Sequence, residues 1–175
     1  DLHSFPTRRS SDLHIAESYF PTCIKPCSLA ATLNSSKMDT KSKLTEDETI
    51  EILIQHLTKT GWIIESRCLG QSHGCDIIAV RDNSKLFVEV KGARAGDKSP
   101  TKKRDFFDSG QIKTHFGKAI VKVLDDKYLN PGSKFAIAHP DDLDIRRVIG
   151  KLTPMIKSLG VKHFWVSPNG EVTED

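Results

Sequence analysis

Two acidic residues and one lysine in the middle of the chain have the types and spacing that phosphodiester chemistry requires. Twelve residues separate Asp76 from Glu89, and Lys91 follows Glu89 after one intervening residue. A pair of carboxylates offers the oxygen ligands that hard divalent cations prefer. Such a cation makes its water nucleophilic near neutral pH and stabilises the charge that develops on phosphorus. A neighbouring ammonium group can hold or deprotonate that water and stabilise the same charge.

The sequence around these residues predicts a β-hairpin over residues 76–90. Two runs rich in Ile, Val and Phe are separated by a polar four-residue segment with the composition of a turn. If the turn pairs Val80 with Lys85, the same register places Asp76 directly opposite Glu89. Two like charges in that position have Cβ atoms about 4.5–5.5 Å apart and destabilise the pair. We therefore expect a cation between them.

Lys91 is expected on the same face of the hairpin as Glu89. Successive side chains of a strand alternate between its two faces, so residues two positions apart share a face. The ammonium group of Lys91 and the two carboxylates then converge at one end of the hairpin, where they could hold a divalent cation and a scissile phosphate. The backbone carbonyl of Val90 could add a further oxygen ligand.

The segments 74–79 and 88–92 together have the form GxD…ExK. This motif resembles that of the PD-(D/E)xK superfamily, which includes many restriction endonucleases and Holliday-junction resolvases. The resemblance implies a restriction endonuclease-like fold and a metal-dependent endonuclease of the restriction, repair or recombination type. It also implies that Asp76 and Glu89 bind the metal and that Lys91 is the catalytic lysine.

The same resemblance implies a cofactor and partners. The cofactor is Mg²⁺, for which Mn²⁺ can substitute, and the nucleic acid is DNA, with RNA not excluded. A homodimer is also implied, because cutting two strands with one site per subunit often requires two copies. Cys75 stands where the superfamily name has proline, a position that varies among members.

Two more site positions follow from the resemblance. Relatives often carry a glutamate on the first helix that approaches the metal, and either Glu51 or Glu48 could serve. We expect Glu51, because it borders the apolar stripe of that helix, although an exposed helix glutamate is the commoner case. Gln111, near the start of the second predicted helix, resembles a glutamine that some branches place beside the site.

Basic residues are concentrated just after the predicted catalytic strand. The segment 92–104 has five basic residues against one acidic residue, and a polar flank of the following helix adds more. We expect these side chains to bind nucleic-acid backbone, although such segments are often only solvated. The expected contacts are Arg94, Lys98, Lys102, Lys103, Arg104 and Lys118, with His115 and Lys122 on the same helix flank as Lys118.

Apolar periodicity predicts an α/β fold with the element order αβββαβαβ, a mixed β-sheet flanked by helices. Thr45 and Glu48 have the spacing of a capping box at the start of the first helix. The predicted helices are 46–61, 109–124 and 145–159, the last of them kinked or restarted at Pro154. The predicted strands are 62–68, 76–80, 85–90, 134–138 and 161–166.

Composition indicates one domain and a tail. The 175 residues, 37% hydrophobic and 28% charged, suffice for one core. Residues 1–37 are rich in Ser, Thr and Pro, and residues 3–13 resemble a translated sequencing-adapter string. We therefore expect a non-native or disordered tail before a single domain over residues 38–175. The net charge of +3 does not by itself indicate a nucleic-acid partner.

The remaining features set the expected compartment and the alternatives. The sequence contains no run of about 20 apolar residues, which is the length that a membrane-spanning helix needs. The four cysteines lack CxxC spacing, which favours free thiols and a cytoplasmic setting.

Two other functions remain open: a catalytically inactive nucleic-acid-binding module with the same fold, and an α/β interaction domain in which the triplet is fortuitous.

Overall fold

A computed structural model of the chain describes residues 43–69, 74–96, 99 and 105–175. Within this part of the chain the strands are β1 (Ile63–Arg67), β2 (Ile77–Arg81), β3 (Ser84–Val90), β4 (Lys134–Pro140), β5 (Val161–Val166) and β6 (Val172–Glu174). The helices are α1 (Glu46–Lys59), α2 (Ser109–Leu129), α3 (Leu143–Ile149) and α4 (Thr153–Ser158), with a short 3-10 helix, η2 (Gly150–Leu152), between the last two.

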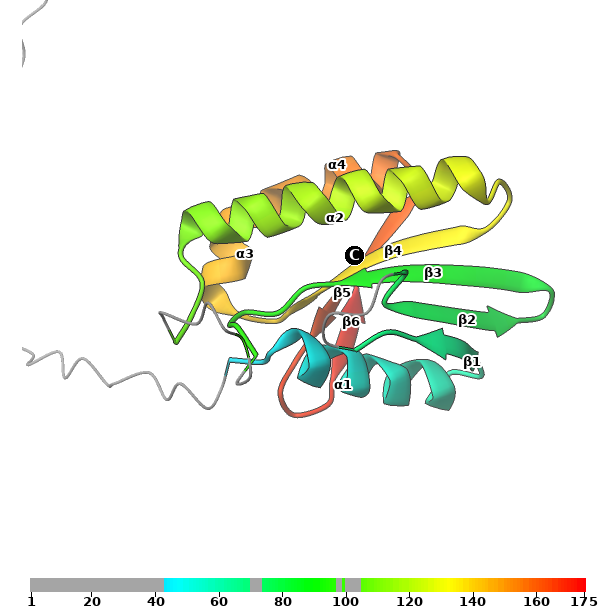
Figure 1. The fold of residues 1–175 in the computed structure, drawn as a ribbon, viewed down its shortest axis with the longest axis horizontal. Coiled ribbons are helices and arrows are strands. Elements are labelled where there is room, and N and C mark those ends of the chain that lie inside the picture. Colours follow the sequence, from blue (N-terminus) through cyan, green and yellow to red (C-terminus); the bar gives the residue numbers. More distant parts are fainter. Residues whose placement is uncertain (1–42, 70–73, 97–98, 100–104) are drawn as a thin grey trace, which may run out of the picture. The chain divides into compact units, whose positions relative to one another are not determined.

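The described strands form one mixed sheet in which they follow their order along the chain, from β1 to β6. β1, β2 and β3 form an antiparallel meander, β3, β4 and β5 run parallel, and β6 returns antiparallel to β5. α1 covers one face of the sheet, and α2, α3 and α4 cover the other (Figure 1). This architecture confirms the predicted α/β class and is consistent with a restriction endonuclease-like fold.

Three details differ from the sequence prediction or refine it. β6 was not predicted, because a three-residue strand is too short to show an alternating pattern. α2 continues five residues past its predicted end at Leu124, because helical hydrogen bonding propagates to the cap at Asn130 without further apolar residues in the core. The predicted restart at Pro154 is confirmed, since this proline lies in the first turn of α4.

Local sequence explains how α1 begins. The hydroxyl of Thr45 accepts a hydrogen bond from the backbone N–H of Glu48, whose carboxylate accepts one from the backbone N–H of Thr45. The apolar stripe of α1 then buries Ile50, Leu53 and Leu57 against the sheet. Within the described residues, no helix combines the length and apolar character needed to cross a membrane.

The alternation of β3 connects the two cores of the protein. Leu86, Val88 and Val90 belong to the apolar core beneath α1, whereas Phe87 belongs to the core beneath α2. Glu89 is two positions from Phe87 and therefore lies on the α2 face of the sheet. The fold thus places one of the predicted site carboxylates beneath α2.

Candidate functional site

The β2–β3 hairpin has the predicted register. Val80 pairs with Lys85, and the last pair of the ladder joins Ile77 to Val88. Asp76 therefore lies one residue beyond the last pair of the ladder. Its Oδ2 accepts a hydrogen bond of 2.7 Å from the backbone N–H of Val90. This bond holds the carboxylate of Asp76 across the end of β3, beside Glu89.

The Lys91 ammonium group lies between these two carboxylates. Its Nζ is 2.8 Å from Glu89 Oε1 and 3.8 Å from Asp76 Oδ2. It also donates a hydrogen bond of 2.6 Å to the backbone carbonyl of Val90. Asp76 and Glu89 are only 7% and 4% exposed, so two acidic groups are held out of water and neutralised by a lysine. The register of the hairpin had led us to expect a cation at this point.

A second lysine reaches the site from α2. Lys122 Nζ is 2.5 Å from Glu89 Oε2 and 3.8 Å from Asp76 Oδ1, and it also donates to the backbone carbonyl of Gly74. The sequence had placed Lys122 on the polar flank of the helix but not beside the carboxylates. The spacing of four residues from Lys118 indicates the flank, but only the crossing of α2 over the end of β3 brings Lys122 to the site.

The glutamate that α1 contributes to the site is Glu46. The expected residue, Glu51, does not contact the site residues. Glu46 Oε2 is 3.3 Å from Lys91 Nζ. Glu51 instead pairs with Arg67 at 2.6 Å, and both side chains are about half exposed. The end of β3 meets α1 at its first turn, whereas Glu51 lies more than a turn further along the helix. The alternative candidate, Glu48, is engaged in the capping box.

Gly92 allows this approach of α1 to the end of β3. A Cβ atom on Gly92 would lie 2.5 Å from the backbone nitrogen of Glu46 and 2.8 Å from the carbonyl carbon of Thr45. The next residue, Ala93, donates a backbone hydrogen bond of 2.8 Å to the carbonyl of Leu44. No side chain fits between these backbones. Glycine at position 92 therefore allows the first turn of α1 to come close enough for Glu46 to reach Lys91.

The surroundings of these groups shift their pKa values. Burial, reinforced by the charge of Glu89, raises the pKa of Asp76 to about 7. Burial also raises the pKa of Glu46, against the opposing effect of Lys91. For both Lys91 and Lys122, burial alone would lower the pKa, but the surrounding carboxylates outweigh it and the pKa is raised. Both lysines are therefore firmly protonated in this arrangement.

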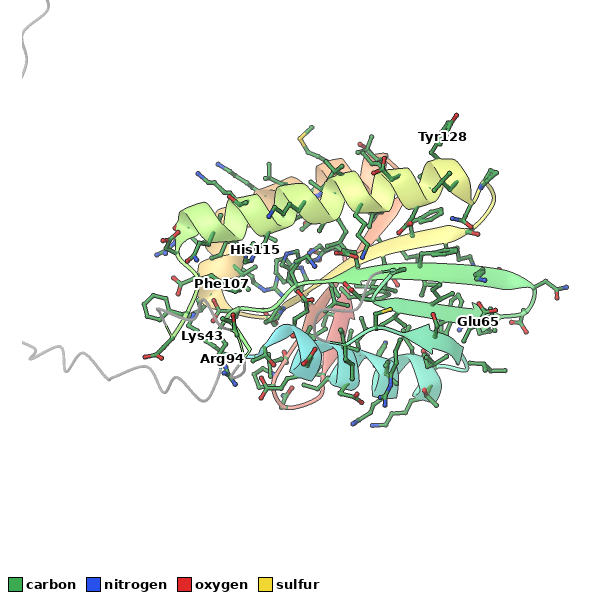
Figure 2. The ribbon with its side chains drawn as sticks, in the orientation of Figure 1. Lys43, Glu65, Arg94, Phe107, His115 and Tyr128 are labelled. Carbon is green, nitrogen blue, oxygen red and sulfur yellow. The ribbon has the colours of Figure 1, made fainter. Side chains whose placement is uncertain are left out.

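Gln111 and Arg94 hold the local structure rather than the carboxylate pair. The side-chain oxygen of Gln111 accepts a hydrogen bond of 3.1 Å from the backbone N–H of Asp108, which completes the cap of α2. Arg94 donates 2.8 Å to the backbone carbonyl of Lys43 and contacts Glu48, and its side chain is 16% exposed. Figure 2 shows Arg94 and Lys43 beside each other near the start of α1. Gln111 is thus a capping residue, and Arg94 joins the end of β3 to α1.

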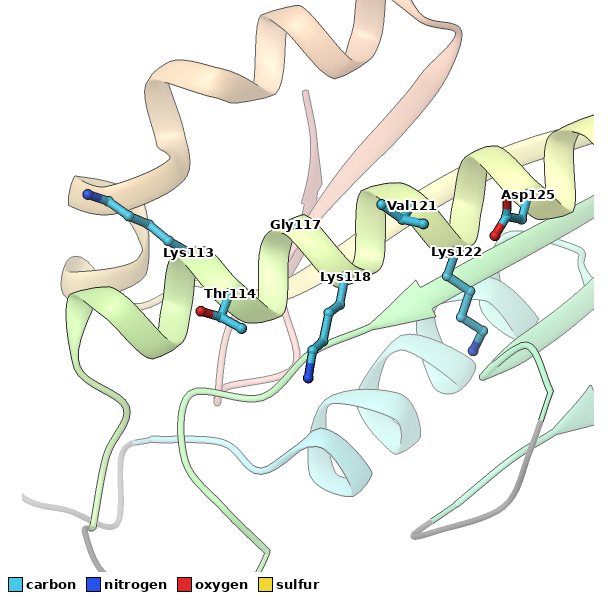
Figure 3. A pocket seen from close by; sticks show the side chains of 7 residues that line it. All are labelled: Lys113, Thr114, Gly117, Lys118, Val121, Lys122 and Asp125. Atoms are coloured by element: carbon cyan, nitrogen blue, oxygen red, sulfur yellow. The ribbon is translucent and has the colours of Figure 1, made fainter.

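The other predicted nucleic-acid contacts divide between two regions. Lys98, Lys102, Lys103 and Arg104 lie outside the described residues. Lys118 is exposed on α2, at an open hollow of about 420 Å³. Lys118 and Lys122 extend from α2 toward β3 and α1, whereas Lys113 extends the opposite way (Figure 3). The hollow is lined by Lys113, Thr114, Gly117, Lys118, Val121, Lys122 and Asp125.

Comparisons with known proteins leave the family of this chain open. No protein-family model matches the chain. No curated protein matches it either. A crystal structure of an XisH family protein from Nostoc punctiforme is 21% identical, with a TM-score of 0.48, and the match covers 73% of this chain and 97% of that chain. The structure of Pyrococcus furiosus SfsA in complex with Ca²⁺ is 19% identical, with a TM-score of 0.28, and the match covers 70% and 57% of the two chains.

Neither likeness is strong enough to assign the chain to a family. The fold and the site by themselves define an α/β protein with a buried centre of two carboxylates and two lysines at the end of a hairpin. Glu46 adds a third carboxylate at the edge of this centre.

Proposed function

We propose that this chain is a Mg²⁺-dependent nuclease that hydrolyses phosphodiester bonds in DNA, with Mn²⁺ able to replace Mg²⁺. The observation that carries the proposal is the pair of buried carboxylates, Asp76 and Glu89, held beside each other with ammonium groups on both sides. Two like charges held together out of water cost stability, and they raise the pKa of Asp76 to about 7. Strongly shifted pKa values are concentrated at functional sites. The type of chemistry follows from the donor atoms.

The residues of the site suit Mg²⁺ better than a metal that needs a complete protein cage. Asp76 and Glu89 supply carboxylate oxygens, and the carbonyl of Val90 lies at the same place, since Lys91 contacts all three residues. Among the described residues, no three His, Cys, Asp or Glu side chains cluster as a ready metal-ligand set. Mg²⁺ needs no such set, because it keeps several waters and is usually held by one or two carboxylates.

The chain's own residues would divide the remaining tasks. When bound, Mg²⁺ supplies a water of lowered pKa and neutralises charge on the phosphate. Lys91, held by Glu46, would orient or deprotonate the attacking water and stabilise the negative charge that develops on phosphorus. Lys118, on the flank of α2, would contact the nucleic-acid backbone.

The DNA substrate and the homodimer are parts of the same proposal. Basic residues on α2 and in the segment that follows β3 support a nucleic-acid partner, and cutting two strands with one site per subunit favours two copies. RNA is a testable alternative substrate, and sedimentation of the purified protein would give its oligomeric state.

A cleavage assay tests the proposed function. Plasmid, branched DNA and RNA are incubated with Mg²⁺ or Mn²⁺ and either the wild-type protein, Asp76→Asn or Lys91→Met. We expect each substitution to lower the rate of hydrolysis by at least about 10²-fold. Lys85→Met is the matched control, because Lys85 pairs with Glu65 at the other end of the hairpin and should leave activity unchanged.

The other outcomes of this assay are equally informative. Binding of nucleic acid without hydrolysis in either metal would contradict the proposal and identify a catalytically inactive binding module. A protein that neither binds nor cuts nucleic acid would instead be an α/β interaction domain.

A further inference from the structure

Lys91 and Lys122 share the four carboxylate oxygens of the site between them. Lys91 lies against Glu89 Oε1 and Asp76 Oδ2, whereas Lys122 lies against Glu89 Oε2 and Asp76 Oδ1. The two ammonium groups therefore occupy different sides of the carboxylate pair. Lys91 comes from the end of β3 and Lys122 from the helix that crosses above it.

The two lysines differ in how firmly they are held. The side chain of Lys91 is 15% exposed and also contacts Glu46 and the carbonyl of Val90. The side chain of Lys122 is 35% exposed, and its partner beyond the two carboxylates is the carbonyl of Gly74. A lysine on a helix surface has a long flexible stem, so Lys122 can withdraw from the carboxylates without disturbing the backbone.

The charges at the site give such a movement a consequence. Glu46, Asp76 and Glu89 carry three negative charges when ionised, and the two lysines carry two positive charges. A divalent cation added between the carboxylates turns this excess of one negative charge into an excess of one positive charge. That positive excess complements the single negative charge of a phosphodiester, and it depends on Lys122 remaining nearby.

Two other titratable groups lie near Lys122, and neither of them supplies a positive charge. Asp126 lies one turn further along α2, and its charge acts on both Lys122 and Glu89. The Cys75 thiol is neutral near physiological pH, because burial raises its pKa to about 12. Lys122 is therefore the cation that α2 supplies to the carboxylate pair.

We propose that Lys122 is an exchangeable counter-ion of the site, which neutralises Asp76 and Glu89 until a divalent cation takes its place and then contacts a phosphate oxygen of the substrate. This role rests on the proposed nuclease function and names a residue and a step that the function alone does not require. After the exchange Lys122 would act beside Lys118, which extends in the same direction from α2 (Figure 3).

The first test measures metal binding without any substrate. Titration calorimetry at pH 8 compares Mg²⁺ binding to the wild-type protein, Lys122→Met and Lys113→Met. Because Lys122 competes with Mg²⁺ for the carboxylates and repels it, we expect Lys122→Met to bind Mg²⁺ about tenfold more tightly. Lys113 extends away from the site on the same helix, and its substitution should leave Mg²⁺ affinity unchanged.

The second test measures cleavage at saturating Mg²⁺. Lys122→Met should lower kcat/KM by about 10²-fold although it binds the metal more tightly, because a phosphate contact is lost. Lys122→Arg, which keeps the charge, should restore part of the rate, and Lys85→Met, at the other end of the hairpin, should behave as wild type. A merely structural lysine would not move metal affinity and cleavage in opposite directions.

Failure of this inference is distinguishable from failure of the proposed function. If the wild-type protein binds Mg²⁺ and cleaves DNA but Lys122→Met has unchanged or weaker Mg²⁺ affinity, or unchanged cleavage, the exchange is refuted and the nuclease function stands. If the wild-type protein neither binds Mg²⁺ nor cleaves nucleic acid, both are refuted.

Discussion

The carboxylate of Glu46 lies 3.3 Å from the ammonium nitrogen of Lys91, although 45 positions separate the two residues in the chain. Glu46 begins α1, and Lys91 directly follows β3. The contact joins the first turn of a helix on one face of the sheet to a site that lies on the other face. The two residues form a partly buried ion pair. Burial raises the pKa of Glu46, and the positive charge of Lys91 opposes that change.

We predict that Glu46→Gln lowers cleavage by about tenfold, the lower end of the effect usual for residues that orient a catalytic group. Loss of the negative charge would leave Lys91 less firmly placed between Asp76 and Glu89. The matched control is Glu51→Gln, because Glu51 lies on the same helix but pairs with Arg67. The comparison is made on kcat/KM, and a larger loss for Glu51→Gln than for Glu46→Gln would disprove the assignment.

The second prediction concerns the stability of the junction between β3 and α1. Gly92→Ala should lower the free energy of unfolding by about 1–3 kcal/mol, the usual cost of forcing extra atoms into a packed region, because the new Cβ meets the backbone of Thr45 and Glu46. Urea denaturation followed by tryptophan fluorescence gives this free energy. The activity of the folded variant should also fall, since Glu46 moves away from Lys91.

Gly117→Ala serves as the control for Gly92→Ala. Gly117 lies in α2, and a Cβ atom there would meet nothing within 4 Å. Alanine favours helix over glycine by about 1 kcal/mol, so this variant should unfold at higher urea concentration than wild type. Equal stability of Gly92→Ala and wild type would contradict the predicted clash.

A pair of buried histidines predicts how stability depends on pH. His139 Nδ1 and His163 Nε2 are 3.1 Å apart, and the two side chains pack against Trp165 and Phe116. Burial lowers both pKa values, that of His163 to about 4 and that of His139 well below its usual range. The pair is therefore neutral in the folded protein at neutral pH.

The sign of the pH effect follows from proton binding. Unfolded histidine binds a proton near pH 6.5, whereas these folded histidines do not. Their stabilising contribution is thus complete above pH 6.5 and is lost as the pH falls from 6.5 toward 4. For each histidine we expect the free energy of unfolding to fall by about 1.4 kcal/mol per pH unit over this range. The raised pKa of Asp76, about 7, makes a contribution of opposite sign, so the histidine effect is measured as a difference between variant and wild type.

His163→Phe should remove about one proton from this dependence. The variant is compared with wild type by urea denaturation at pH 8, 6.5 and 5, and the slope of the unfolding free energy against pH is the readout. The slope is informative even if the substitution lowers stability at every pH. An unchanged slope in His163→Phe would show that His163 is not one of the groups that take up a proton on unfolding.

Short-range patterns in the sequence predicted the hairpin and the face that its residues share. A four-residue turn sets the register of β2 and β3, and strand alternation then decides that Glu89 and Lys91 lie on one side. Both rules act over a few residues and need no knowledge of the rest of the fold. The capping box at Thr45 is a local pattern of the same kind.

The residues that approach from other elements could not be chosen in this way. Helical spacing offered Glu48 and Glu51 as candidates, and only the meeting of β3 with the first turn of α1 shows that Glu46 is the glutamate that reaches Lys91. Lys122 was recognised as part of a polar flank, but its contact with Glu89 requires α2 to cross above the strand.

The sequence by itself therefore determined the central triplet of Asp76, Glu89 and Lys91, its common face and its need for a cation, because periodicity and turn geometry are local. Tertiary structure decided which cations and which third carboxylate complete the site. That choice depends on how α1 and α2 pack against the sheet, with Gly92 allowing one of these approaches. Packing between distant elements leaves no fixed spacing in the sequence.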